Sequence, residues 1–242
     1  MNRQLLVPHR AIMNKKLLLG PVAKPLVFIA SLLPFAWLLY AAITNQLGAN
    51  PAEALIRATG DWTLRFLCIV LAVTPLRVLT QTPQLARFRR MLGLFMYFYA
   101  VCHLLSYSWF DMGFDVPDIA KDIAKRPFIL VGFSSIVLLT PLALTSFNRA
   151  IKFLGAKRWQ TLHKLVYAIA GLGILHFFWM RAGKNNFAEV FVYAGILALL
   201  LGWRVVHAWK QKRLQTSPVN RTVNFAGSSK PVGGQRSVRQ GQ

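Results

Sequence analysis

The hydrophobic residues of this chain are gathered in six long segments that are separated by short polar ones. Each segment holds about 19 to 23 residues, which at a helical rise of about 1.5 Å per residue spans the roughly 30 Å hydrocarbon core of a bilayer. The segments are 26–44, 62–80, 91–110, 128–147, 161–180 and 187–209. This pattern predicts an all-α membrane protein with six transmembrane helices.

The composition supports the same class. Hydrophobic residues make up 55% of the 242 residues and charged residues 15%, whereas a soluble domain carries about 25% charged residues. These values exclude a soluble globular protein, a collagen and a disordered chain. Both cysteines, Cys68 and Cys102, lie inside hydrophobic segments, which excludes a disulfide framework and a cysteine zinc site.

The charged residues are divided unequally between the two sides of the predicted bundle. One side holds both termini, the loops 81–90 and 148–160, and the helix-end residues Arg77, Lys164 and Arg204. It carries 22 of the 29 Lys and Arg residues and no acid. The other side holds the remaining seven basic residues and all seven acids. The positive-inside rule therefore places both termini in the cytoplasm. The basic residues do not form one soluble face, so no nucleic-acid partner is predicted.

Three regions follow from these patterns. Residues 1–25 are a basic cytoplasmic N-terminal segment, residues 26–209 are the six-helix transmembrane domain, and residues 210–242 are a basic cytoplasmic tail. The tail is rich in Ser, Gly and Arg from about residue 215, which predicts disorder. The first hydrophobic segment is longer than the core of a signal peptide and no A-x-A site follows it, so we expect it to remain as a helix.

Two histidines are predicted to lie at matching depth in the outer half of the membrane. His103 lies 13 residues after Arg90, about 20 Å along a helix, and His176 lies five residues before Arg181. Two imidazoles on different helices at one depth are what a heme iron needs for axial ligation from both faces. The alternative is a pair of core histidines, each bonded to a carbonyl or a hydroxyl.

A second heme is a further hypothesis. His163 lies 13 residues before His176, about 20 Å nearer the cytoplasm, but the third segment has no matching histidine. Arg89 and Arg90 occupy that level instead. Arginine has no acceptor and is a poor iron ligand, although it pairs well with heme propionates or a flavin phosphate. One heme is therefore predicted, and a second stays open.

The chain shows no catalytic motif. A Ser/His/Asp set, paired carboxylates, a Walker loop, CxxC and GxGxxG are all missing from the sequence. An iron with two histidine ligands has no open position, so it transfers electrons rather than activating a substrate. This favours a non-catalytic electron-transfer role for the chain.

The loop 111–127 is predicted to contain an amphipathic helix. Ile119 and Ile123 share one stripe, with Asp118 and Asp122 beside it. Such a helix could dock a partner, and an amphipathic segment that rests on the membrane surface is an equally ordinary interpretation.

Four of the segments together resemble the ferric-reductase-like transmembrane domain, and closely the MsrQ family. They read TGDWTLRFLCIVLAVTPLRV, RRMLGLFMYFYAVCHLLSY, RPFILVGFSSIVLLTPLALTS and WQTLHKLVYAIAGLGILHFFW. The resemblance covers about residues 15–210, in order and with similar loop lengths. The combination is specific, whereas each string alone would be weak.

The resemblance implies a multi-pass b-type cytochrome of the bacterial inner membrane. It implies heme b and FMN as cofactors, with quinol or a cytoplasmic flavin reductase as the electron donor. The implied recipient is a periplasmic molybdenum-cofactor methionine sulfoxide reductase, which repairs oxidised methionines and forms a heterodimer with this subunit. His103 and His176 correspond to the outer heme ligands and His163 to an inner histidine of the fifth helix. Where related reductases have an inner histidine on the third helix, this chain has Arg89.

Two alternatives remain at this stage. A stand-alone ferric or cupric reductase would share the fold and the histidines, and dependence on a periplasmic partner would distinguish it. A non-redox transporter or scaffold is the other alternative, although the chain shows no clear inverted repeat or broken midplane helix.

Overall fold

The computed structural model describes residues 20–183 and 185–216, and within these ranges the chain forms only helices and turns. The chain divides into two compact units, residues 1–201 and 202–242. The predictions for residues 1–19 and for the tail from residue 217 lie outside the described residues. The domain boundaries at 25 and 209 stay predictions.

Within the described residues, six helices are long and apolar enough to cross a membrane, which confirms the predicted class. They are built on α2 (Ala23–Ile43), α3 (Pro51–Leu79), α4 (Arg89–Phe110), α6 (Pro127–Leu144), α9 (Leu165–Ala182) and α10 (Ala188–Thr216). Short elements lie between them, namely η1 (Pro83–Phe88), α5 (Val116–Lys125), α7 (Asn148–Leu154) and α8 (Ala156–Leu162).

The predicted start of the second membrane helix is wrong, because α3 begins at Pro51 and not at residue 62. Asn50 caps the helix, since its side-chain Oδ1 accepts a hydrogen bond from the backbone N–H of Glu53 at 3.1 Å. Proline has no backbone N–H, but the first turn of a helix does not require one, and the fixed φ of proline fits a helix. The hydropathy pattern missed these first turns because they carry polar residues.

The fifth membrane segment is also not the continuous helix that the sequence predicts. It is divided into α8 and α9, with His163 and Lys164 in a turn between them. The backbone N–H of His163 still donates to the carbonyl of Trp159 at 3.0 Å. His163 therefore lies at a helix end rather than inside a helix.

Tyr99 is the centre of the packing between α2, α3 and α4. It is completely buried, and its ring stacks on Phe66 with centroids 5.2 Å apart. Its hydroxyl accepts from the N–H of Phe35 at 3.0 Å and donates to the carbonyl of Ser31 at 2.9 Å. The hydroxyl thus takes the place of a normal helical hydrogen bond beside Pro34, where the α2 ladder already lacks a donor.

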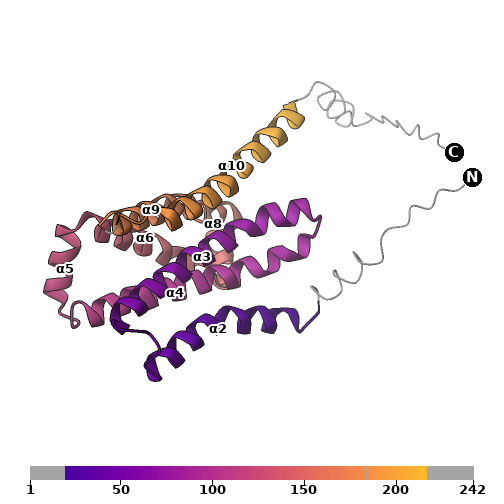
Figure 1. Cartoon of the computed structure of the whole chain (residues 1–242). Coiled ribbons are helices and arrows are strands. Elements are labelled where there is room, and N and C mark those ends of the chain that lie inside the picture. The colour runs from indigo at the N-terminus through magenta and orange to yellow at the C-terminus, as the bar shows by residue number, and fades with distance from the viewer. Residues whose placement is uncertain (1–19, 184, 217–242) are drawn as a thin grey trace, which may run out of the picture. The chain divides into compact units, whose positions relative to one another are not determined.

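Two antiparallel helix pairs, α3 with α4 and α6 with α9, form the part of the first unit that matters for function. α5 lies across one end of these helices, between the ends of α4 and α6 (Figure 1). We call this the α5 end, and we call the opposite end, with η1, α7 and α8, the α8 end.

Candidate functional site

A cavity of about 550 Å³ lies between α3, α4, α6 and α9, in the size range of small-molecule and cofactor sites. Most of its lining is apolar, with residues such as Leu67, Met96 and Leu139 along its walls. Its charged lining residues belong to the first turns of α3 and to the ends of α4 and α5, namely Glu53, Arg57, Asp61, Asp111 and Arg126. The cavity is therefore apolar along its length and charged at the α5 end.

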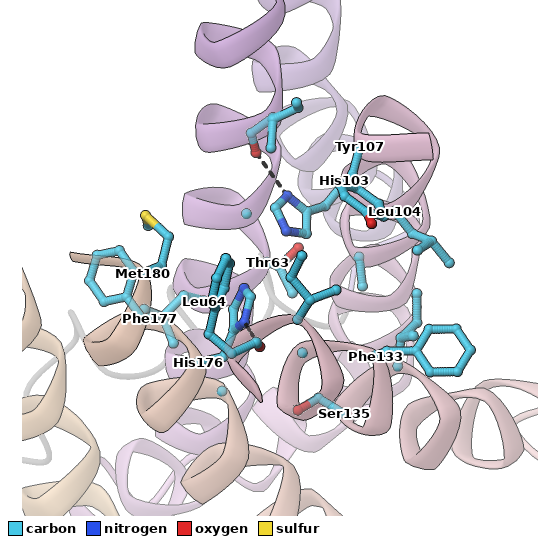
Figure 2. Close-up of a pocket in the computed structure, with 18 of the residues that line it drawn as sticks. Thr63, Leu64, His103, Leu104, Tyr107, Phe133, Ser135, His176, Phe177 and Met180 are labelled. Carbon is cyan, nitrogen blue, oxygen red and sulfur yellow. Dashed lines mark hydrogen bonds between the residues drawn. The ribbon is translucent and has the colours of Figure 1, made fainter. Parts of the chain in front are cut away.

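His103 of α4 and His176 of α9 lie side by side in this cavity. Their ring centroids are 6.1 Å apart and their planes are inclined by 75°. Each ring makes a hydrogen bond on the side away from the other ring (Figure 2). The sequence argument from matching depth therefore predicted their neighbourhood correctly, whereas their role as ligands stays a proposal.

The hydrogen bonds determine which ring nitrogen carries the proton. Nδ1 of His103 lies 2.8 Å from the carbonyl oxygen of Ile56, and Nδ1 of His176 lies 2.6 Å from that of Phe128. A carbonyl only accepts, so Nδ1 is the donor in both rings. A neutral imidazole then keeps the lone pair on Nε2, which is the atom available to a metal.

The spacing of the rings fits a single iron between them. A metal–imidazole bond is about 2 Å long, and an imidazole nitrogen lies about 1 Å from its ring centre. Two imidazoles on opposite sides of one metal therefore have centroids about 6 Å apart, which agrees with the observed 6.1 Å. The alternative of two core histidines accounts for the Nδ1 bonds but not for this spacing or for the cavity.

Four residues at this site could not be singled out from the sequence. Ile56 and Phe128 act through backbone carbonyls, which every residue has, so no sequence signal could reveal them. Gly60 and Gly132 lie directly against the rings of His103 and His176. Glycine is common in membrane helices, and only the pairing of each glycine with a histidine on a neighbouring helix would have revealed its role.

At the α8 end the predicted residues have different neighbours. The ring of His163 lies on Trp159 with centroids 4.0 Å apart, and its Nε2 is 3.5 Å from Oγ1 of Thr145. Arg89 donates to the hydroxyl of Thr74. Arg90 donates to Oδ1 of Asn148 at 2.8 Å.

The predicted helix in the loop 111–127 is present as α5. Asp115 caps it by accepting from the N–H of Asp118 at 3.0 Å, and the side chain of Asp118 is exposed. Asp122 instead forms an ion pair with Arg126 and accepts a hydrogen bond from the hydroxyl of Tyr107. These bonds, first the one from Arg126, lower the pKa of Asp122. The two aspartates therefore differ, and Asp122 serves to attach α5 to α4.

Comparison with known proteins gives evidence on this chain that is independent of the geometry of the site. A family model described as "Ferric reductase like transmembrane component" matches residues 59–174. A protein of Polaromonas naphthalenivorans is 79% identical over 204 residues, which cover 84% of this chain and 93% of the relative. The chain belongs to the MsrQ family.

Other MsrQ relatives are more distant but cover similar shares of the chain. One from Herminiimonas arsenicoxydans is 57% identical over 78% of this chain and 87% of its own length. One from Rhodospirillum rubrum is 46% identical over 83% and 94%, respectively. All three are named "Protein-methionine-sulfoxide reductase heme-binding subunit MsrQ". No solved structure matches the chain. The resemblance to the MsrQ family is confirmed.

Proposed function

We propose that this chain is the heme-binding membrane subunit of a methionine sulfoxide reductase system and carries electrons across the bacterial inner membrane. Membership of the MsrQ family supports heme binding and a methionine sulfoxide reductase partner. The observation that carries the proposal is the pair of facing imidazoles, 6.1 Å apart, with both Nδ1 atoms bonded to carbonyls.

His103 and His176 are the proposed axial ligands of a heme b. A heme with two histidine ligands supplies a one-electron redox centre without an open coordination position. The apolar walls of the cavity exclude water, and the carbonyls of Ile56 and Phe128 hold the rings in the ligating tautomer. The chain then moves electrons, and the reduction of the sulfoxide belongs to the partner.

The charge distribution sets the proposed direction. The Lys and Arg residues of η1, of the first turn of α4 and of α7 and α8 lie at the α8 end, whereas the described acids lie in the first turns of α3 and α10 and around α5. The positive-inside rule counts Lys and Arg, so we infer that the α8 end faces the cytoplasm and the α5 end the periplasm. The partner, a molybdenum-cofactor reductase, would then dock near α5, where Asp118 is exposed. Both chain termini would lie in the cytoplasm.

The α8 end would receive electrons from quinol or from a cytoplasmic flavin reductase. His163 follows α8 directly, and Arg89 and Arg90 are the first residues of α4, directly after η1. Guanidinium groups are suited to hold the phosphate of FMN or heme propionates. FMN and a second heme at this level are parts of the proposal that rest on the family resemblance.

A difference spectrum tests the proposal. The dithionite-reduced minus oxidised spectrum of the purified protein should show heme b bands. His103→Ala and His176→Ala should lose them, whereas His207→Ala, a matched histidine of α10 outside the cavity, should keep them. A partial loss in His163→Ala would support a second heme.

The controls separate misfolding from ligand loss. His103→Gly and His176→Gly should regain heme bands when free imidazole is added, because the small ligand can occupy the vacated space. A wild-type protein without heme, despite ample heme supply, would overturn the proposal. Reduction of ferric or cupric salts at an equal rate with and without the periplasmic partner would favour the stand-alone metal reductase.

A further inference from the structure

The two histidines sit in local environments that repeat each other. The ring of His103 bonds the carbonyl of Ile56 and lies against Gly60, four residues further along α3. The ring of His176 bonds the carbonyl of Phe128 and lies against Gly132, again four residues further along α6. We call these two carbonyl–glycine pairs the histidine seats.

Helix geometry explains the spacing of four residues. Every Cα–Cβ bond in a helix tilts towards the N-terminus, so the side chain of residue i+4 covers the turn that contains the carbonyl of residue i. A glycine at i+4 leaves that carbonyl open from the side. An imidazole on a neighbouring helix can then approach closely enough to donate its Nδ1–H.

The available space at the seats is small. A Cβ added to Gly132 would lie 2.7 Å from Nδ1 and 2.8 Å from Cε1 of His176, which is closer than real Cβ contacts allow. A Cβ added to Gly60 would lie 3.1 Å from both Nδ1 and Cε1 of His103. Alanine at either seat must therefore displace the ring, and more so at Gly132.

We propose that Gly60 and Gly132 are positioning residues that set the hydrogen bond and the orientation of the two axial imidazoles, and through them the redox potential of the heme. This inference rests on the proposed function. A carbonyl that accepts from Nδ1 makes the imidazole a more basic ligand, which favours the ferric state and lowers the potential. Displacement of a ring by alanine weakens that bond, so the potential should rise.

The seats also impose a crossed arrangement on the rings. The two planes are inclined by 75°, because each ring is directed to a carbonyl on a different helix. Crossed imidazoles donate to different d orbitals of a ferric iron and leave those orbitals nearly equal in energy. This arrangement produces a single, strongly shifted low-field EPR line, whereas parallel imidazoles produce three well-separated lines.

The test compares seat glycines with glycines on the ligand helices. The seat variants are Gly60→Ala and Gly132→Ala. The controls are Gly93→Ala on α4 and Gly171→Ala on α9, where an added Cβ meets nothing within 4 Å. For each purified protein, the heme content per protein, the midpoint potential and the ferric EPR spectrum are measured.

We expect an upward shift of the midpoint potential and a displaced low-field EPR line in both seat variants, with the larger shift or a loss of heme in Gly132→Ala. The controls should match the wild type. Seat variants that keep heme with unchanged potential and EPR would overturn the inference while leaving the proposed function intact. Loss of helix content in both seat variants, with intact controls, would also overturn it, because the glycines would then serve the fold. A wild-type protein without heme would overturn the proposed function itself.

Discussion

The α5 end and the α8 end of the bundle both contain histidine, but the histidine rings have different hydrogen-bond partners and different surroundings at the two ends. At the α5 end, His103 and His176 each have one nitrogen bonded to a carbonyl and share a cavity. At the α8 end, the ring of His163 lies on the indole of Trp159, and its Nε2 is 3.5 Å from the hydroxyl oxygen of Thr145. The two ends therefore differ in whether Nε2 faces space or a protein atom.

This difference shows what makes a membrane histidine a ligand candidate. The residue type is shared by both ends. The α5 end adds a second imidazole at the distance that one metal requires, and it adds glycines that allow both rings to reach carbonyls. Substitutions can disturb the pair of imidazoles and the glycines separately.

The largest expected effect comes from filling the cavity without touching a histidine. Gly173 of α9 lines the cavity, so Gly173→Leu should place a side chain in the space proposed for heme. Overpacking of this kind costs about 1–3 kcal/mol, which weakens binding about fivefold to more than a hundredfold. The measurement is heme content per protein after purification.

The matched variant is Gly171→Leu on the same helix. Gly171 is exposed, and an added Cβ there meets nothing within 4 Å. It should keep the wild-type heme content. An equal heme content in Gly173→Leu would show that heme does not occupy this cavity, and the comparison between the two ends would then lose its basis.

Much of the fold could be predicted from the sequence because the bilayer restricts the choice of structure. Six long hydrophobic segments leave few alternatives to six helices. The same depth argument placed His103 and His176 together. The start of α3 and the break at His163 could not be read in this way, because they depend on a cap by Asn50 and on local turns rather than on hydrophobicity.

The histidine seats could not be predicted for a different reason. They depend on which helices are neighbours, since Gly60 meets a histidine of α4 and Gly132 meets one of α9. A single sequence carries no such pairing information. The different contacts of Asp118 and Asp122 could not be predicted either, because they depend on the position of Tyr107 at the end of α4.

A smaller effect, on stability rather than on heme, is expected from Tyr99→Phe. The hydroxyl of Tyr99 bonds both Phe35 and Ser31 of α2, and its loss leaves buried backbone groups without that partner. Such a loss costs about 1–3 kcal/mol, so the thermal unfolding temperature in detergent should fall. Heme content in the folded protein should not change, because Tyr99 does not line the cavity.

Tyr97→Phe is the control for this variant. The hydroxyl of Tyr97 lies 3.4 Å from Oγ1 of Thr140, whose single proton is donated to the carbonyl of Ile136 at the shorter distance of 2.8 Å. The unfolding temperature of Tyr97→Phe should therefore fall less. Equal decreases for both variants would contradict the role assigned to the Tyr99 hydroxyl.

At the α5 end, Asp122→Asn should loosen α5 by less than about 1 kcal/mol, since half-exposed ion pairs contribute little. The pKa of Asp122 is lowered in the folded chain, so its contribution is present above the unfolded value of about 3.9 and is lost as the pH falls through the lower folded value. The protection of residues 116–125 against hydrogen exchange, taken as the ratio of the intrinsic to the observed rate at the same pH, should fall in Asp122→Asn at neutral pH and in the wild type in strong acid. Asp118→Asn should exchange like the wild type, and equally fast exchange in both variants would contradict the attachment role of Asp122.

The smallest effect should appear in electron delivery to the proposed periplasmic partner, and only at low salt. Asp118 is exposed on α5, so Asp118→Lys changes the surface charge while the bonds of Asp122 that attach α5 remain. Charges on a docking surface alter the association rate, and salt screens them within about 10 Å at 0.1 M. Delivery should therefore slow at low ionic strength and recover at high ionic strength. Lys152→Glu on α7 changes an exposed charge at the α8 end and should leave the rate unchanged when the chain is reduced directly by dithionite, so that no donor has to bind. A rate in Asp118→Lys that equals the wild type at every ionic strength would remove α5 as the docking surface and favour its alternative role, as an amphipathic helix that rests on the membrane.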